Sequence, residues 1–496
     1  MTERHKHILF FILCAGILQL LVLLNFEGYL YLSDSAQSFV MQTWRKVVPP
    51  RHGFTVVPPE GARRYKAVYE KMPPGLAHCG LMLFYEAPRD ISIAALAGFS
   101  LRYTRYYKSY QLEKDIRKYN GLKNGRSIKK GDVIYIPHPL PALAYDLARD
   151  SLPVPVFSRG LYYTGSTAGR SSFFEMLDPY IRQGVNTVVF DAKDITGIIN
   201  YHSHVPAVVD LNTHGKRTID DLEKFIRELR KRNIYIIARV AVFHDHLLHR
   251  KRPDLAIQSA STGKPWRGPG QELWCDPTSR AVQDYNLSIA VELAEHGVDE
   301  IQFDYIRFPT GGNQGDARFA YNFGKMSTAD TITGFLRRAH GEISRRNTLL
   351  SIDIFGVVAW GKAADIRNTG QDIKMLSKYC DVISPMLYPS HFNDDFDGHA
   401  KPGDQPYYFI YTGCAKVRSL AEGTLVRPWL QAFRWRTSSY DADYILQQIR
   451  GAYDAGAKGY LFWNASNNYD TVYRALSEMN RKHESAGKNA AKRMEQ

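Results

Sequence analysis

Apolar residues recur along the chain in eight short, nearly continuous runs, each followed by a polar stretch and usually by a segment with helical periodicity. A strand that helices cover on both faces has such an uninterrupted run. Eight strand–helix units over roughly 300 residues are the number and size of a (β/α)8, or TIM-type, barrel of the α/β class. The expected strands are residues 160–164, 187–190, 234–242, 300–306, 349–355, 382–388, 426–432 and 459–463.

The helices of this barrel are visible in the same pattern. Residues 222–231 place their leucine, isoleucine and phenylalanine side chains on one face at helical spacing, with Thr218 or Asp220 as the cap. Further helices are expected at 281–296, at 331–344 with Asp330 as the cap, and at 442–453.

The N-terminus carries one long uncharged run. Residues 8–26 contain no charged side chain and follow the basic Arg4 and Lys6. At about 1.5 Å per residue the run can cross most of a hydrocarbon core of about 30 Å. Because the basic flank precedes the run, the positive-inside rule leaves the rest of the chain outside the cytoplasm. We expect a single-pass signal anchor with a periplasmic or extracellular C-terminal bulk, although Ser35 and Ala36 leave cleavage open.

Proline pairs and shifts in composition divide the chain into six segments. Residues that precede proline avoid the helical region of backbone angles. The proline-rich stretches on either side of residues 77–137 are therefore expected to be irregular or extended. The expected order is a basic flank with the anchor at 1–30, a spacer at 31–76, a compact module at 77–137, a linker at 138–158, the barrel at 159–480 and a basic disordered tail at 481–496.

The compact module has the pattern of a strand, two helices and a second strand. It closes with Asn-Gly-Leu at 120–122 and Ile-Lys-Lys-Gly-Asp-Val-Ile-Tyr-Ile-Pro at 128–137. These features resemble the LysM family, whose small β-α-α-β domains bind glycans containing N-acetylglucosamine. The connection between the helices is longer than in the family, with Arg-Tyr-Thr-Arg-Tyr-Tyr-Lys at 102–108. The resemblance implies peptidoglycan or another N-acetylglucosamine glycan as a partner, and a module that only packs or spaces is the alternative.

Charge and cysteine content narrow the class of protein only slightly. The chain carries 64 basic and 50 acidic residues, a net charge of +14, which favours anionic partners. No basic motif with interleaved aromatic residues is present, so nucleic acid is not an expected partner. The cysteines outside the apolar N-terminal run lack the CxxC spacing of a metal cluster, and both free thiols and disulfides stay open.

Two carboxylates stand at the ends of the fourth and fifth expected strands, Asp304 and Asp353. Cleavage of a glycosidic bond needs an acid that protonates the leaving oxygen and a second carboxylate that attacks carbon or activates water. Arg307, just beyond Asp304, would keep that carboxylate ionised, as a nucleophile or charge stabiliser requires. Apolar neighbours would raise the pKa of Asp353, the condition for a general acid at neutral pH.

Further polar and aromatic side chains at the strand ends are candidates for binding a sugar chain, because aromatic faces stack on pyranose rings and polar groups bond to hydroxyls. His246 and His249 could meet on a helix, but no third ligand stands at a telling spacing, so no metal and no cofactor are expected. Trp429, within the seventh strand, is expected to be a core residue. The substrate-binding candidates are Asp191, Lys193, Asp194, His244, Asp245, Arg307, Tyr388 and Trp463.

Five stretches of the barrel resemble a bacterial family of glycoside hydrolases of unknown specificity that is distantly related to the α-amylase superfamily, and the resemblance covers roughly residues 158–478. They lie at 159–164, 189–194, 301–309, 353–356 and 384–389. The resemblance implies that Asp304 occupies the place of the nucleophilic Asp that ends strand four. It also implies that Asp353 occupies the place of the acid Glu that ends strand five. Two positions depart from the amylase pattern, since Gln302 replaces an Arg and Asp353 replaces the Glu.

The expected function is therefore a membrane-anchored, exported glycoside hydrolase that acts on a cell-envelope or extracellular polysaccharide. The alternatives are a non-catalytic carbohydrate-binding or envelope-scaffold protein on the same barrel, and a glycan-modifying enzyme such as a transglycosylase. The expected partners are a carbohydrate polymer and, through the N-terminal helix, a membrane.

Overall fold

The computed structural model describes residues 74–494 except 80–81, 105, 123–126, 138–156, 323–325, 347 and 422. The expected anchor and nearly all of the expected spacer and linker lie outside these residues. The chain divides into two compact units, Met1–Tyr145 and Asp146–Gln496. In the part of the chain that the structure describes, no helix is both long enough and apolar enough to span a membrane.

The described part of the first unit is a small α+β module. Its antiparallel sheet has the strand order β1-β2-β3, and two helices connect β2 to β3. Ser92 caps the first helix by accepting from the Ala95 amide at 3.1 Å, and Gly121, at φ 64°, ends the second. Strand β1 was not expected from the sequence. The elements are β1 (Leu76–Cys79), β2 (Met82–Glu86), α4 (Ile93–Ser100), α5 (Ser109–Asn120) and β3 (Val133–Ile136).

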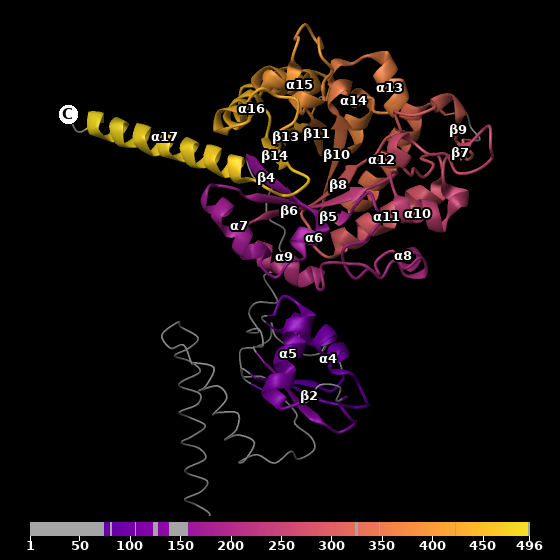
Figure 1. Ribbon diagram of the computed structural model, residues 1–496, viewed down its shortest axis with the longest axis vertical. Helices are drawn as coiled ribbons and strands as arrows, with labels where there is room; N and C mark the ends of the chain where they lie inside the picture. Colours follow the sequence, from indigo (N-terminus) through magenta and orange to yellow (C-terminus); the bar gives the residue numbers. More distant parts are fainter. Residues whose placement is uncertain are drawn as a thin grey trace, which may run out of the picture. The chain divides into compact units, whose positions relative to one another are not determined.

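The second unit is a closed parallel barrel, which confirms the predicted fold class (Figure 1). Each neighbouring pair of strands is parallel, and the pairing of β10 with β11 completes the ring. The seventh position is shared by two short strands, β12 and β13, because Pro428 between them has no N–H to donate. The strands are β4 (Ser158–Tyr163), β5 (Thr187–Lys193), β6 (Tyr235–Ala241), β8 (Glu300–Asp304), β10 (Leu349–Phe355), β11 (Val382–Met386), β12 (Leu425–Val426), β13 (Trp429–Gln431) and β14 (Gly459–Trp463).

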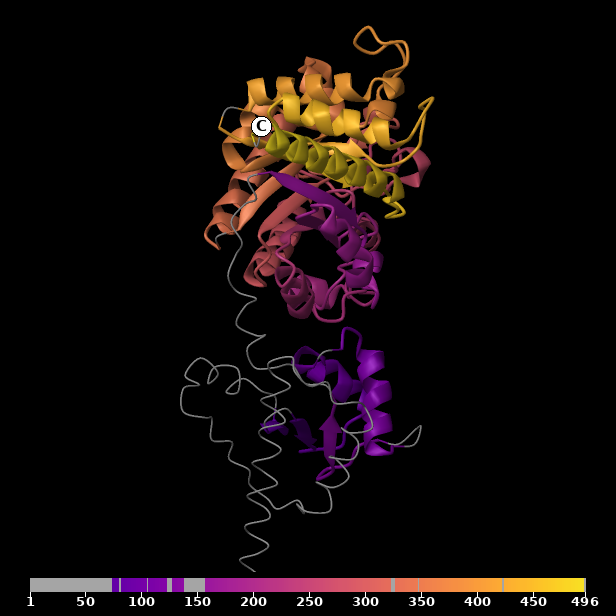
Figure 2. The same ribbon diagram turned by 90° about the vertical axis from the view of Figure 1, so that its left-hand side faces the viewer.

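Helices follow most strands and cover the outside of the barrel (Figures 1 and 2). Helices α15, α16 and α17 pack side by side on one flank. The helices are α6 (Gly165–Ala168), α7 (Phe173–Arg182), α8 (Pro206–Asp210), α9 (Leu222–Arg230), α10 (His246–Lys251), α11 (Arg280–Glu295), α12 (Thr328–Ser344), α13 (Ala363–Thr369), α14 (Ile373–Leu376), α15 (Pro406–Leu420), α16 (Ala442–Asp454) and α17 (Asp470–Met494). A small two-stranded antiparallel sheet joins β7 (Gln258–Ser259) to β9 (Ala317–Arg318).

Two helix caps and the C-terminal tail differ from the sequence-based expectations. The cap of α9 is Asp221, and the cap of α12 is Ser327, because these side chains accept the amide three residues on, at 2.9 and 3.1 Å. Helix α17 continues to Met494, where we expected a disordered tail from residue 481. Residues 481–494 contain no proline and are rich in Ala, Lys and Arg, which are good helix formers, so the helix extends through them.

The interior of the barrel is filled in layers. Near the N-terminal ends of the strands, Glu300 pairs with Arg427 and accepts from the Tyr235 hydroxyl at 3.1 Å. Toward the C-terminal ends of the strands, an apolar layer follows this buried network. The polar residues at the C-terminal ends pack against that layer. The apolar cluster consists of Tyr162, Val189, Tyr235, Ile237, Tyr388, Trp429 and Leu461.

Candidate functional site

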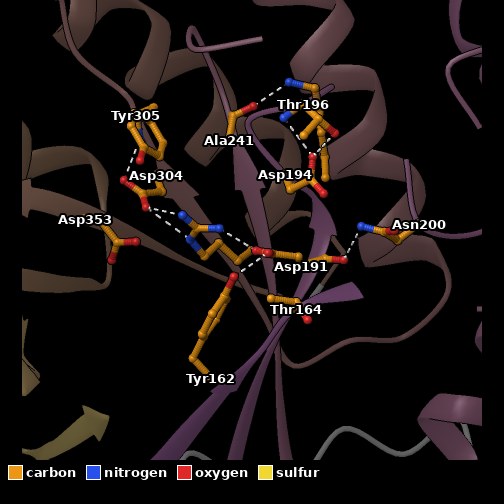
Figure 3. A network of polar contacts seen from close by, with 12 residues as sticks. Tyr162, Thr164, Asp191, Asp194, Thr196, Asn200, Ala241, Asp304, Tyr305 and Asp353 are labelled. Carbon is orange, nitrogen blue, oxygen red and sulfur yellow. Dashed lines mark hydrogen bonds and ion pairs between the residues drawn. The ribbon is translucent and has the colours of Figure 1, made fainter. Parts of the chain in front are cut away.

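Three carboxylates lie at the C-terminal ends of β5, β8 and β10. Asp191, Asp304 and Asp353 are all buried. In the strand register Ser351 is paired with Gln302, so Asp353 and Asp304, each two residues further on, reach the same level of neighbouring strands. Figure 3 shows the Asp353 side chain beside that of Asp304. Both acids therefore stand at the C-terminal ends of neighbouring strands, at the same level of the barrel.

Arg239, on β6, joins two of these acids. Its Nε and Nη2 atoms donate to Oδ2 of Asp304 at 3.0 and 2.6 Å, and its Nη1 donates to Asp191. The Tyr162 hydroxyl donates to the other oxygen of Asp191 at 2.5 Å. A guanidinium group placed between two buried carboxylates offsets the cost of keeping them out of water. Burial nevertheless raises the pKa of Asp191 to about 6, against the opposing effects of Arg239 and Tyr162.

Asp304 receives one further donor from its own chain. The backbone N–H of Tyr305 donates to Oδ1 of Asp304 at 2.6 Å. Tyr305 has a φ of 50°, a left-handed conformation that a non-glycine residue adopts at an energetic cost. This turn ends β8 at Asp304, two residues earlier than expected, and it aims the amide at the carboxylate.

Asp353 has a different environment from Asp304. Its Oδ1 accepts from the indole Nε1 of Trp429 at 2.7 Å, whereas its Oδ2 is buried and has no hydrogen-bond partner among the described residues. Burial, and then the negative charge of Asp304, raise the pKa of Asp353 well above its usual range. The structure thus places a carboxyl group that favours its protonated form next to an ion-paired carboxylate.

An aromatic wall borders the acids on the side of β11, β13 and β14. The Trp463 ring lies 5.8 Å from Tyr388 and 6.3 Å from Tyr162, centroid to centroid. Burial, and then the charges of Asp353 and Asp304, raise the pKa of Tyr388 well above its usual range.

The wall continues outward through His391 to Trp435. His391 lies 5.2 Å from Tyr388 and 4.9 Å from Trp435, ring to ring. The Trp435 side chain is 48% exposed. Aromatic residues therefore lead from the solvent to the buried acids.

A second group of rings lies beyond β6 and β8. His244 stacks on Trp274 with ring centroids 4.7 Å apart, and it meets Tyr305 edge-on at 5.0 Å. Burial, and then the neighbouring His246, lower the pKa of His244 to about 3, so this imidazole is neutral at physiological pH. The Nε2 atoms of His244 and His246 are 3.1 Å apart. Within the described residues, no group of three or more His, Cys, Asp or Glu side chains is arranged to hold a metal ion.

Three of the predicted substrate-binding residues make structural contacts instead of joining the acid cluster. Lys193 and Asp245 form an ion pair of 2.8 Å in which both side chains are completely buried. Asp245 also caps α10, accepting from the Leu248 amide at 2.8 Å. Asp194 accepts from the amide of Thr196 at 2.8 Å, within its own loop. In this structure the charges of these residues are engaged with the protein itself.

The expected pairing of Asp304 with Arg307 is wrong, because Arg239 is the ion-pair partner of Asp304. The left-handed turn at Tyr305 carries the chain away from the carboxylate. The Arg307 guanidinium instead lies over the rings of Phe355 and Trp274, at 4.2 and 4.8 Å from their centroids, and its Nη1 donates to the Phe308 carbonyl at 2.9 Å.

Four site residues were not identified as such from the sequence. The sequence does contain a sign of the role of Arg239. It is the only charged residue in the apolar stretch 235–242, and a charge buried in a strand is expected to have a buried partner of opposite charge. Trp429 is a core residue, as expected, but its indole N–H also serves Asp353. The four are Tyr162, Arg239, Tyr305 and Trp429.

The parallel barrel is of the glycoside hydrolase type, as its family match shows. Residues 160–469 match the family described as "Putative glycosyl hydrolase domain", and the chain belongs to this family. No curated protein gives a significant match.

Several solved structures resemble parts of the chain. A hypothetical protein from Ruminiclostridium thermocellum ATCC 27405 is 33% identical, over 39% of this chain and 96% of that one, with a TM-score of 0.35. The PgaB (BpsB) glycoside hydrolase domain from Bordetella bronchiseptica is 15% identical, over 63% of this chain and 95% of that one, with a TM-score of 0.46. A class V chitinase from Pseudomonas fluorescens Pf-5 is 14% identical, over 64% and 98%, with a TM-score of 0.41.

Proposed function

We propose that the barrel is a glycoside hydrolase that cleaves a cell-envelope or extracellular polysaccharide with Asp304 and Asp353. The observation that carries this proposal is the contrast between two neighbouring carboxyl groups. One is ion-paired with Arg239, and the other is buried, has a raised pKa and leaves one oxygen without a partner. An ion-paired carboxylate next to a carboxyl group that favours its protonated form suits the two roles that hydrolysis of a glycosidic bond requires.

Asp304 acts as the nucleophile or as the stabiliser of positive charge at the anomeric carbon. Its three N–H donors, two from Arg239 and one from Tyr305, fix the orientation of the carboxylate. A carboxylate held in one orientation loses little entropy when it reacts. Asp353 acts as the general acid and donates its proton to the leaving oxygen, with Trp429 holding the opposite carboxyl oxygen.

The aromatic wall supplies the binding surface for the sugar rings in this proposal. Trp463, Tyr388 and Trp435 form a path from solvent to the acids. Their ring faces suit the apolar faces of pyranoses. A path longer than one ring suits a polymer better than a free monosaccharide, which supports a polysaccharide substrate.

The test is turnover by the purified chain on a panel of envelope and extracellular polysaccharides, followed as newly formed reducing ends. Asp304→Asn and Asp353→Asn keep the side-chain shape and remove the ionisable group, so each should lower turnover by about a hundredfold or more. Asp284→Asn is the matched control, because Asp284 pairs with Arg280 and Arg338 on the outer helices. Parental turnover by both of the first two variants would refute the assignment. Absence of turnover on every polymer would favour the non-catalytic carbohydrate-binding alternative.

We also propose that the small N-terminal module binds N-acetylglucosamine glycans in the manner of LysM domains. The order β2, α4, α5, β3, with β2 and β3 antiparallel neighbours, supports this proposal. In the full chain, deletion of residues 77–137 should weaken retention on peptidoglycan or chitin and leave turnover of a soluble substrate unchanged. Equal retention with and without the module would support a spacer role.

A further inference from the structure

Arg307 is a buried cation beside the acid pair. Its side chain is only 7% exposed, and three rings surround the guanidinium group, those of Phe355, Trp274 and Tyr305 at 4.2, 4.8 and 5.7 Å. Its one hydrogen bond to a described residue goes to the Phe308 carbonyl. The guanidinium group has five N–H donors, so this bond leaves most of its capacity unused.

Among the described residues, Arg307 also lacks the carboxylate partner that the buried Arg230, Arg239 and Arg427 have. Arg230 pairs with Asp299 at 2.7 Å, and Arg239 and Arg427 pair with buried acids at similarly short range. Within the described residues, no carboxylate lies within 4.0 Å of the Arg307 nitrogens. Asp304 and Glu272 act on it only from a greater distance, and Glu272 accepts from the Trp274 indole at 2.9 Å. A buried charge without a partner is costly, so such a residue is expected to have a function.

The position of Arg307 relates it directly to the candidate chemistry. Phe355, which its guanidinium covers, lies on β10 two residues after Asp353. Tyr305, also under the guanidinium, gives its amide to Asp304. Arg307 thus lies three residues past the end of β8 and in contact with Phe355 of β10, beside the strand ends that carry the two acids.

We propose that Arg307 binds a carboxylate carried by the sugar chain, so that the substrate is an acidic polysaccharide. This inference rests on the proposed function. A guanidinium group matches a carboxylate with two parallel N–H donors, and the surrounding rings hold its plane and exclude water, which strengthens the contact. The carboxylate could belong to the ring of a uronic acid or to the lactyl ether of N-acetylmuramic acid.

The experiment uses the full chain with Asp353→Asn, so that binding is measured by calorimetry without turnover. One probe is a hexasaccharide of alternating glucuronic acid and N-acetylglucosamine, and the other is a glycan tetrasaccharide of N-acetylglucosamine and N-acetylmuramic acid. Each is compared with its own neutral form, in which the carboxyl is reduced to an alcohol. At least one acidic probe should bind about tenfold or more tightly than its neutral form. The probe that shows the preference identifies the source of the carboxylate.

Arg307→Gln should abolish this preference and bind the neutral probe as the parent does. Arg307→Lys keeps the positive charge but loses the planar pair of donors, so it should retain only part of the preference. This variant takes the place of Arg307→Gln if the Gln variant fails to fold. Arg450→Gln is the control, because Arg450 lies exposed on α16 and pairs with Asp454. A preference that survives in folded Arg307→Gln, or no preference for either acidic probe in the parent, would overturn the inference.

These outcomes are distinguishable from failure of the proposed hydrolase function. Cleavage of a neutral polymer that needs Asp304 and Asp353 but not Arg307 would keep the hydrolase and reject the acidic substrate. Carboxylate binding that depends on Arg307 in a chain that cleaves nothing would keep the binding site and reject the hydrolase.

Discussion

Replacement of Arg239 by Gln should show how much the buried acid cluster depends on one cation. The Arg239 side chain is 8% exposed, and those of its partners Asp191 and Asp304 are 3% and 9% exposed. Gln cannot make three charge-assisted hydrogen bonds, so two buried carboxylates lose their counter-charge. Removing one partner of a buried ion pair costs about 3–5 kcal/mol. We expect a loss of this size in the free energy of unfolding at pH 8.

The loss should depend on pH with a definite sign. Burial raises the pKa of Asp191 in the folded protein to about 6, above its ordinary value of 3.8. A group with a raised folded pKa favours the folded state most below its unfolded pKa, and this contribution is lost as the pH rises through the folded pKa. Without Arg239 the pKa of Asp191 rises further, because the guanidinium had lowered it. The destabilisation of Arg239→Gln should therefore be smaller at pH 5 than at pH 8.

Urea unfolding followed by tryptophan fluorescence at both pH values measures these free energies. Arg230→Gln is the matched control, since it breaks the buried pair with Asp299, which precedes β8 at the opposite end of the barrel. It should lower stability and leave turnover of the folded protein unchanged, whereas Arg239→Gln should lower both. Equal stability of Arg239→Gln and the parent at pH 8, or a loss that is no smaller at pH 5, would refute the reasoning.

Three further predictions concern the acid, the rim and the N-terminus. Trp429→Phe removes the indole N–H donor, which lowers the pKa of Asp353. The alkaline limb of the pH–rate profile should therefore move to higher pH. An unmoved limb would exclude Asp353 as the general acid. Trp435→Ala should raise the KM for long polysaccharide chains several-fold and leave kcat unchanged. Tyr453→Ala, which removes another exposed aromatic ring, on α16, is the control. An unchanged KM for Trp435→Ala would show that Trp435 is not part of the binding path. A reporter fused after Gln496 should be active only outside the cytoplasm, and cytoplasmic activity would reverse the expected orientation.

The barrel could be predicted because its strands are buried on both faces. Each strand then has a run of apolar residues that needs no alternation to be recognised. The residues at which the strands end could be predicted less well, as β8 shows. Its apolar pattern continues to Ile306, but the left-handed turn at Tyr305 stops the hydrogen-bonded ladder at Asp304. Hydrophobicity reports burial and not the backbone angle that ends a strand.

The two acids could be predicted to meet because strand ends in a parallel barrel share one face. The ion-pair partners of the two acids could not be predicted, because a cation close in the sequence is only one of many candidates. Asp304 and Arg239 are 65 positions apart, and only the pairing of Ala241 with Asp304 across β6 and β8 brings Arg239 within reach. Arg307 is closer to Asp304 along the chain, but the left-handed turn at Tyr305 between them carries it away from the carboxylate.

The two arginines together explain why a separate binding role for Arg307 is physically consistent. If Arg307 paired with Asp304, its guanidinium would be consumed by the acid and Arg239 would be a second cation with one carboxylate, Asp191. In the structure Arg239 pairs with both acids, and none of the described carboxylates forms an ion pair with Arg307. Asp191 and Asp304 thus have their counter-charge without Arg307. An anion that reaches the mouth can bind to Arg307 without breaking any ion pair of the protein.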